Sequence, residues 1–264
     1  MELRIQLATV GVLWRREVRL FFRQRSRVIG ALAPPLLLWL AIGAGIAPRF
    51  SLGNGEVNYL EYLYPGILMM LLLQVSISTT MSVIEDRREG FLQGVLVAPG
   101  SRGSMVLGKS LGAASVAVLH GLMFLVLAPW AGFPLGNIAW PTLLAALLSL
   151  ALALTLTGFV IAWWLNSVQG YHVVMSLALF PLWIVSGAMF PTDGLHAVLR
   201  PVVQFNPLTY GMAAIRRGLY GADLPDSVVL AGPNALVELA VVIGASLLLL
   251  TLAWRIANRR RLPA

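Results

Sequence analysis

Between Ile138 and Leu165 the chain reads IAWPTLLAALLSLALALTLTGFVIAWWL, with no charged side chain. The uncharged run extends outward from there to Ser110 and to Thr192. It is interrupted at residues 129–137 and 166–170, which are rich in residues that end helices or open turns. A helix crosses the hydrocarbon core in about 20 apolar residues. The run therefore predicts three transmembrane helices joined by two tight turns.

The composition indicates the same class of protein. Hydrophobic residues make up 58% of the chain and charged residues 11%, against about 25% charged in a typical soluble domain. Segments of alternating polarity, which mark a membrane β-barrel, are absent from the sequence. The chain has no cysteine, which excludes disulfides and thiolate metal sites. The net charge of +8 is expected to mark a cytoplasmic face rather than a nucleic-acid site.

We predict an all-α integral membrane protein, a single transmembrane domain over residues 1–264. Six transmembrane helices are expected, at about 28–47, 64–84, 105–128, 138–165, 171–190 and 234–256. All but four of the 19 basic residues lie in the two terminal segments or the loop after the second span; the exceptions are Arg49, Arg200, Arg216 and Arg217. The positive-inside rule then places both termini and the 85–104 loop in the cytoplasm. The seven arginines of residues 1–27 argue against a cleavable signal peptide.

The N-terminal segment, residues 1–27, has the pattern of an amphipathic helix. Apolar side chains recur in steps of three and four and form one stripe: Leu3, Leu7, Val10, Trp14, Val18 and Phe21. The opposite side carries Arg15, Arg16, Arg19 and Arg23. Such a helix lies along the inner leaflet with its arginines among lipid phosphates. It serves either as a topology anchor alone or also as a contact for a cytoplasmic partner.

Residues 103–110, GSMVLGKS, match the P-loop pattern G-x-x-x-x-G-K-[ST]. A P-loop requires a soluble α/β domain with a phosphate-wrapping loop and an acidic residue for magnesium. Here Ser110 opens a membrane span, and the intervening Met105, Val106 and Leu107 are bulky and apolar. We reject nucleotide binding and interpret Lys109 as an interfacial lysine that snorkels to water.

The loop after the second span reads EDRREGFLQGVLVAP over residues 85–99. Its charged start is followed by Phe91, Leu92, Val95 and Leu96, which share one face of a short predicted helix. A short amphipathic helix held between two spans suits insertion into a groove of another protein. The alternative is a solvated loop whose apolar residues pack on its own helix ends.

In these features the chain resembles the permease subunits of type-2 ABC exporters, a group that includes drug, polysaccharide and lipo-oligosaccharide exporters. The resemblance covers essentially the whole chain. It depends on the basic amphipathic N-terminal helix and on four motifs in order: EDRREG (85–90), APGSR (98–102), LGK (107–109), and FNPLTY (205–210) followed by Arg216 and Arg217.

The resemblance implies a coupling helix in this loop that docks on a separate ABC ATPase. The residues implied in ATPase coupling are Glu85, Asp86, Arg87, Arg88, Glu89, Phe91, Leu92, Val95 and Leu96. It also implies that the N-terminal helix is the connecting helix and that LGK is a family feature. Two ATPase copies would bind ATP and Mg, and this chain would hold no cofactor. In a bacterial inner membrane the chain would form a homodimer, or a heterodimer with a similar permease.

Residues 191–233 are too polar to span the membrane. Asn206 and Pro207 predict a helix start, with Asn206 as N-cap, and the helix should run from Leu208 to about Tyr220. Similar permeases fold this region as two short re-entrant helices at the external side. Arg216 and Arg217 either snorkel to water, or hold this segment or attract an anionic headgroup. Both arginines are also candidates for the substrate path.

Few polar residues occur within the spans. Gln74 and Ser78 of the second span either line a translocation path or bond between helices. Glu238 follows a predicted helix start, where a structural role is expected. His120 and His172 have no ligand partners at metal-binding spacing. We identify no catalytic, cofactor-binding or metal-binding residues.

The favoured function is the permease subunit of an ATP-driven exporter of a lipid-like, glycan or drug substrate. An ion-coupled carrier is disfavoured because the predicted spans are short of the ionisable residues that such carriers use as proton or sodium sites. An intramembrane lipid-modifying enzyme would use Glu238, Asp193 and His196, which form no clustered motif.

Overall fold

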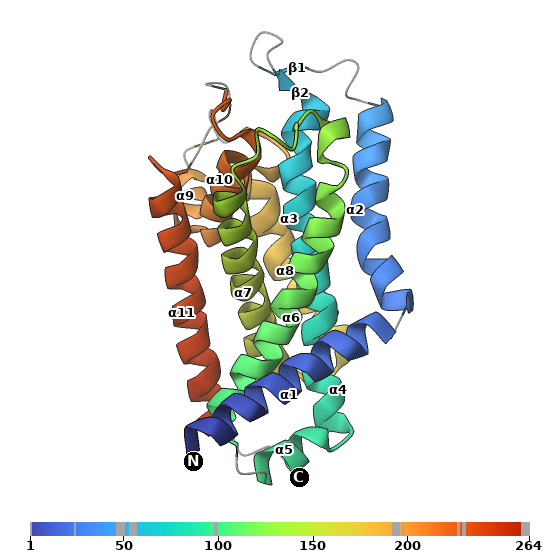
Figure 1. Cartoon of the computed structure of the whole chain (residues 1–264), viewed down its shortest axis with the longest axis vertical. Coiled ribbons are helices and arrows are strands. Elements are labelled where there is room, and N and C mark those ends of the chain that lie inside the picture. The colour runs from blue at the N-terminus through green and yellow to red at the C-terminus, as the bar shows by residue number, and fades with distance from the viewer. Residues whose placement is uncertain are drawn as a thin grey trace.

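The computed structural model describes residues 2–23, 25–45, 51–52, 57–97, 100–191, 196, 198–225, 228 and 231–259. Its long helices run side by side as a bundle (Figure 1). Five of the described helices are long and apolar enough to cross a membrane: Tyr59–Arg88, Arg102–Leu125, Trp140–Trp164, Val168–Ala188 and Ala235–Arg259. The pair Glu2–Arg23 and Val28–Ile42, bent by 67°, brings the number to six if it is one span. The predicted class, an all-α membrane protein, is confirmed.

The helices are α1 (Glu2–Arg23), α2 (Arg25–Gly45), α3 (Tyr59–Thr80), α4 (Ser82–Arg88), α5 (Phe91–Val97), α6 (Arg102–Leu125), α7 (Trp140–Trp164), α8 (Val168–Trp183), α9 (Arg200–Phe205), α10 (Pro207–Tyr220) and α11 (Ala235–Arg259). A π-helical turn, Ile184–Ala188, continues α8, and a 3₁₀ turn, Ala128–Ala131, follows α6. A short antiparallel pair, β1 (Ser51–Leu52) and β2 (Val57–Asn58), precedes α3.

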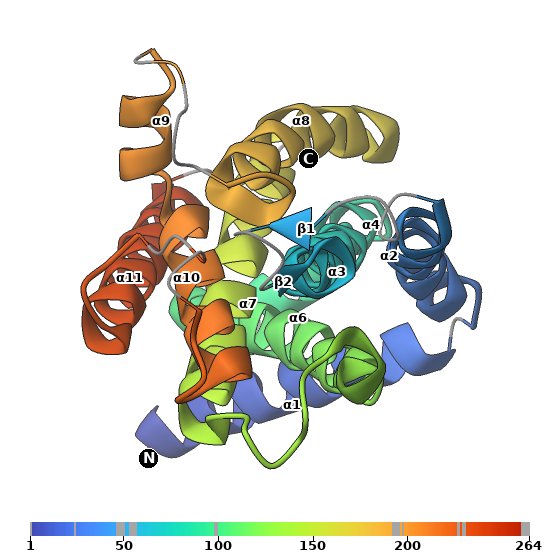
Figure 2. The same ribbon diagram turned by 90° about the horizontal axis from the view of Figure 1, so that it is seen from above.

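Helix α3 is the centre of the bundle, and α2, α6, α7 and α8 surround it (Figure 2). In its most apolar stretch 83% of the residues are buried, whereas the corresponding value for α11 is 17%. Because an apolar helix must cover its side chains, α11 is expected to face lipid or another chain. The bundle is thus ordered from a packed interior to an apolar outer layer.

At one end of the bundle, α1 runs obliquely beneath the long helices, close to α4 and α5 (Figure 1). Helices α3 and α4 are nearly continuous, so the second span extends through Arg88 rather than stopping at Ile84. Gly90 then adopts a φ of 77°, which favours glycine, and the chain turns back into α5. The predicted short helix of the loop is therefore present, on the same end of the bundle as the start of α1.

At the opposite end, α10 follows the capping pattern seen in the sequence. The side chain of Asn206 accepts a hydrogen bond from the Leu208 amide at 3.1 Å, and Pro207 occupies the first turn. Gly221 ends the helix at a φ of 59°, where a Cβ atom would lie 2.1 Å from the carbonyl oxygen of Asn137. The predicted helix is confirmed, while the re-entrant position of α9 and α10 in a membrane stays a prediction.

Candidate functional site

Two glycines of α6 let α1 approach it closely. A Cβ atom on Gly108 would lie 2.9 Å from the Cβ of Leu13, and one on Gly112 would lie 2.6 Å from the Cβ of Glu17. Residues four apart share one face of a helix, so the two glycines form a flat surface against α1. Lys109 follows Gly108 directly, and the close crossing brings it beneath Glu17.

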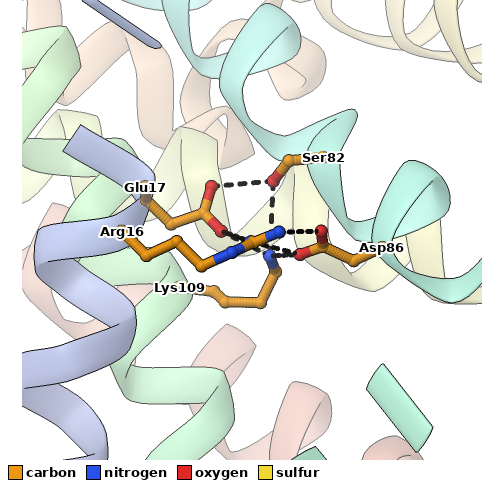
Figure 3. Close-up of polar contacts among 5 residues, drawn as sticks. All are labelled: Arg16, Glu17, Ser82, Asp86 and Lys109. Carbon is orange, nitrogen blue, oxygen red and sulfur yellow. Dashed lines mark hydrogen bonds and ion pairs between the residues drawn. The ribbon is translucent and has the colours of Figure 1, made fainter. Parts of the chain in front are cut away.

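Lys109 is the centre of a buried ion-pair cluster that also contains Arg16, Glu17, Ser82 and Asp86 (Figure 3). Its Nζ atom donates to Glu17 Oε1 and to Asp86 Oδ2, each at 2.5 Å. Arg16 donates to both oxygens of Asp86, at 2.8 and 2.6 Å. Ser82 Oγ donates to Glu17 Oε2 at 2.8 Å. The cluster thus joins α1, α4 and α6.

The cluster is balanced in charge, with two cations and two carboxylates. The side chains of Lys109, Glu17 and Asp86 are only 2%, 5% and 4% exposed, while Arg16 is 25% exposed. A small cavity of about 90 Å³ borders the cluster on the side of Glu85 and Glu89. Buried ion pairs contribute little net stability, but removing one partner leaves a charge without compensation. The cluster therefore fixes the relative position of three helices more than it stabilises the fold.

Contacts from α4 and α5 extend this rigid unit. The guanidinium of Arg16 also lies 3.8 Å from the centre of the Phe91 ring, at the start of α5. Arg87 donates to the carbonyl oxygen of Trp163 at 2.9 Å and to that of Leu165, at the end of α7. Such bonds satisfy carbonyls that have no partner within their own helix. The predicted coupling segment is thus bonded to α1 and to α7.

The predicted coupling residues have unequal exposure. Asp86 lies inside the cluster, and Leu92 is fully buried. Arg88 and Glu89 are exposed, whereas Glu85, Arg87, Phe91 and Val95 are partly buried, and the Leu96 side chain lies outside the described part of the structure. A partner protein would therefore meet Arg88, Glu89, Phe91 and Val95 rather than Asp86 or Leu92.

The predicted interfacial helix is turned relative to the sequence pattern. Trp14, Arg15, Arg19 and Arg23 are exposed, but Arg16 points into the bundle with Glu17. Trp14 is 42% exposed and donates from Nε1 to Ser115 Oγ at 3.0 Å. The face toward α6 is thus partly polar, and it carries Glu17, which the sequence analysis missed. The available signal was that Glu17 is the only acidic residue between residues 3 and 55.

The interpretation of Lys109 as a snorkelling lysine is wrong. Its side chain is buried because two carboxylates, from α1 and α4, compensate its charge. The rejection of a P-loop agrees with the structure, since α6 is helical through all of residues 103–110. The residues that match the motif have other roles: Gly108 allows the close helix crossing, and Lys109, the chain's only lysine, is one of the two cations of the cluster.

A groove of about 370 Å³ lies between α1 and α5, beside the cluster. It is lined by apolar side chains together with Thr9: Ile5, Ala8, Val12, Leu13, Phe91 and Val95. Val12, on the α1 wall of the groove, is 67% exposed. The groove offers an apolar surface at the end of the bundle where α1, α4 and α5 meet.

The two arginines of α10 have internal partners at the other end of the bundle. Arg216 is buried, donates to the carbonyl oxygen of Gly187 at 2.6 Å and stacks over Tyr62. Arg217 Nε donates to both carboxylate oxygens of Glu238 at 3.0 Å, and Glu238 is fully buried. The structural role expected for Glu238 is thus supported, with a partner that the sequence analysis did not identify.

The remaining candidates are dispersed. Gln74 and Ser78 are partly exposed on α3, and the Ser78 hydroxyl donates to the Gln74 carbonyl oxygen at 2.9 Å. Of the residues considered for an enzyme, Asp193 lies outside the described residues, and His196 is exposed. In the described part of the chain, no group of three His, Asp or Glu side chains could hold a metal ion.

Comparisons with known proteins agree on one family. The family model described as ABC-2 type transporter matches residues 8–220. A transport permease named ycf38 from Cyanophora paradoxa is 29% identical over 75% of this chain and 70% of its own length. Nodulation protein J of Rhizobium leguminosarum bv. trifolii is 29% identical over 76% of this chain and 77% of its own length. YbhR of Escherichia coli K12, named as a multidrug ABC transporter permease, is 24% identical over 67% of this chain and 48% of its own length.

Proposed function

Because the chain belongs to the ABC-2 type transporter family, we propose that it is the membrane-spanning subunit of an ATP-driven exporter. A separate ABC ATPase, in two copies, binds and hydrolyses ATP with Mg, and this chain binds no nucleotide. The chain is a transport permease rather than an enzyme. Its substrate is proposed to be lipid-like, a glycan or a drug, and the relative named as a multidrug permease supports the last of these.

The observation that supports ATPase coupling best is the rigid unit at one end of the bundle. The ion-pair cluster ties α4 to both α1 and α6, so a force applied to α5 reaches the second and third spans together. The α1–α5 groove lies on this unit and is apolar. Arg88 and Glu89, which precede α5 in the chain, are exposed and carry charges of both signs. We assign this surface to the ATPase contact, which is a helix-in-groove mode of recognition.

The proposed topology has both termini in the cytoplasm of a bacterial inner membrane. The start of α1 and the end of α11 lie at the same end of the bundle as α4 and α5 (Figure 1). Most arginines of the chain belong to this end, in agreement with the positive-inside rule. The exposed arginines of α1 would then contact lipid phosphates of the inner leaflet.

The proposed translocation path lies along α3 and is completed by a second copy or by a similar permease. In α3 only Leu60, Glu61, Gln74 and Ser78 are not buried within the chain. Gln74 and Ser78 are four residues apart, so they share one face and place polar groups on it. Arg216 and Arg217 have internal partners, and we assign them to holding α10 in place rather than to the path.

The ATPase contact can be tested by co-purification with an ABC ATPase subunit expressed together with the chain. Val95→Asp places a charge in the α1–α5 groove and is expected to abolish co-purification. Gln93→Asp adds the same side chain to the same helix at an exposed position outside the groove. It should bind like the wild type.

Membrane yield and gel-filtration behaviour of both variants show whether the chain still folds. Normal co-purification of a folded Val95→Asp variant would reject the groove as the ATPase contact. The same result for Val12→Asp, on the α1 wall of the groove, would reject it independently.

A further inference from the structure

A second apolar groove, of about 460 Å³, lies on the outer side of the bundle where α1 begins, α6 begins and α11 ends. Its volume is in the range of ligand pockets, about 300–1,000 Å³. Its apolar walls include Leu3 and Leu7 from α1, Leu107 from α6, and Leu250 and Trp254 from α11. It is separate from the ion-pair cluster and from the α1–α5 groove.

The groove opens outward. Leu3, Leu7 and Trp254 are 72%, 63% and 49% exposed, so its apolar walls have no covering within the chain. Helix α11, which forms one wall, is the least buried of the five candidate spans. Exposed apolar surface of this extent marks a contact with lipid or with another protein.

The polar groups near the groove are held in a fixed arrangement. The side-chain oxygen of Gln6 accepts hydrogen bonds from Ser101 Oγ and, at 2.6 Å, from Ser104 Oγ. This leaves the amide nitrogen of Gln6 with no partner among the described residues. A Cβ atom on Gly103 would lie 3.2 Å from the Trp254 ring, so α6 and α11 are in close contact behind the groove.

Exposed arginines stand close in sequence to the groove residues at the start of α1 and at the end of α11. Arg255 follows Trp254 and stands four residues after Thr251, which lines the groove, and Arg259 continues the same helix face. Arg4 lies one turn before Leu7 on α1. All three arginines are exposed. Within residues 2–10 and 250–259 the one acidic residue is Glu2, which is also exposed. Arg102 is held against the carbonyl oxygens of Ala257 and Asn258 at 2.7 and 3.1 Å.

We propose that this groove binds an acyl chain of an anionic phospholipid of the inner leaflet, with the headgroup phosphate among Arg4, Arg255 and Arg259. An apolar groove that ends in exposed arginines matches the two parts of such a lipid. A second copy of the chain is disfavoured there, because a two-fold contact would bring these arginines against themselves. The inference is independent of the transported substrate and of the ATPase contact.

The test uses the full-length chain in phosphatidylcholine vesicles that contain phosphatidylglycerol with a photoactivatable group in its acyl chain. After illumination, peptide mapping should find label on α11 at Leu250–Trp254 and on the first turns of α1. Thr251→Trp fills the groove and should reduce this label several-fold. Leu252→Trp introduces the same side chain at the neighbouring exposed position, outside the groove, and should leave the label unchanged.

The headgroup contact is tested by comparing labelled phosphatidylglycerol with equally labelled phosphatidylcholine. Arg4→Gln and Arg255→Gln should each lower the preference for phosphatidylglycerol about fivefold. Arg19→Gln, at an exposed position of α1 away from the groove, is the control. Equal labelling of the wild type and Thr251→Trp would overturn the proposal.

A second copy in the groove would give a different result. The chain has no cysteine, so a Thr251→Cys variant carries a single thiol. A disulfide-linked dimer of this variant in the membrane would show that the chain itself covers the groove, and would also overturn the proposal.

Discussion

The ion-pair cluster makes a quantitative prediction about Lys109. Lys109→Met keeps much of the side-chain volume but removes the ammonium group that lies 2.5 Å from carboxylate oxygens of both Glu17 and Asp86. Arg16 remains, with its strongest contacts on Asp86, so Glu17 keeps mainly the Ser82 hydroxyl. Breaking a buried pair in this way costs about 3–5 kcal/mol. The expected fall in Tm is on the order of 10 °C.

The double variant Lys109→Met/Glu17→Gln separates the ion pair from other effects of the substitutions. It removes one charge of each sign, and the amide oxygen of the new glutamine can still accept from Ser82. Replacing both partners of a buried pair is close to neutral. The double variant should therefore recover most of the stability that Lys109→Met loses, with a coupling free energy of about 2–3 kcal/mol.

The measurement is thermal or denaturant unfolding of the purified wild type, both single variants and the double variant, in one detergent. The reasoning would be refuted if the single effects were additive within about 0.5 kcal/mol, since residues without contact behave in that way. A Lys109→Met variant as stable as the wild type would refute it as well, because the buried carboxylates would then need no cation.

Two further predictions concern other packing and charge contacts. Gly112→Ala places a methyl group against Glu17 and should destabilise the chain by about 1–3 kcal/mol in the same unfolding assay. The control is Gly244→Ala, in α11 with open space around it, which should be neutral or stabilising by up to about 1 kcal/mol. Equal effects of the two substitutions would contradict the close α1–α6 crossing. Arg217→Met leaves the buried carboxylate of Glu238 without its cation and should lower the free energy of unfolding by about 3–5 kcal/mol. Adding Glu238→Gln should restore most of the lost Tm. Failure to restore it would show that Arg217 acts mainly through its bond to the Gly232 carbonyl oxygen.

Local sequence signals predicted the features that depend on neighbouring residues. The uncharged runs gave the class and the approximate spans, because hydrocarbon thickness fixes the length of an apolar helix. Asn206, Pro207 and Gly221 gave the limits of α10 because capping is a local interaction. The short helix α5 was likewise visible in the spacing of its apolar residues.

The features that were missed depend on contacts between distant segments. The position of Lys109 at the inner end of a predicted span favours a snorkelling lysine, whereas its carboxylate partners Asp86 and Glu17 stand 23 and 92 residues away in sequence. Asp86 and Leu92 were grouped with the docking residues because a helix pattern shows one shared face but not which neighbour covers it. The α1–α6 crossing brings Glu17 against Lys109, which also binds Asp86, and only the packed structure reveals these contacts.

The origin of the ion-pair cluster in three separate segments has a consequence for hybrid proteins. A chimera that takes α1 from one relative and the rest of the chain from another would combine a carboxylate at position 17 with whichever residue that relative carries at position 109. If that residue is not a cation, the charges of the cluster do not balance, and a relative without glycines at positions 108 and 112 would not let α1 approach α6 as closely. Productive exchange points should therefore lie after α6, in the turn at residues 126–139, so that α1, α4 and α6 are inherited as one block.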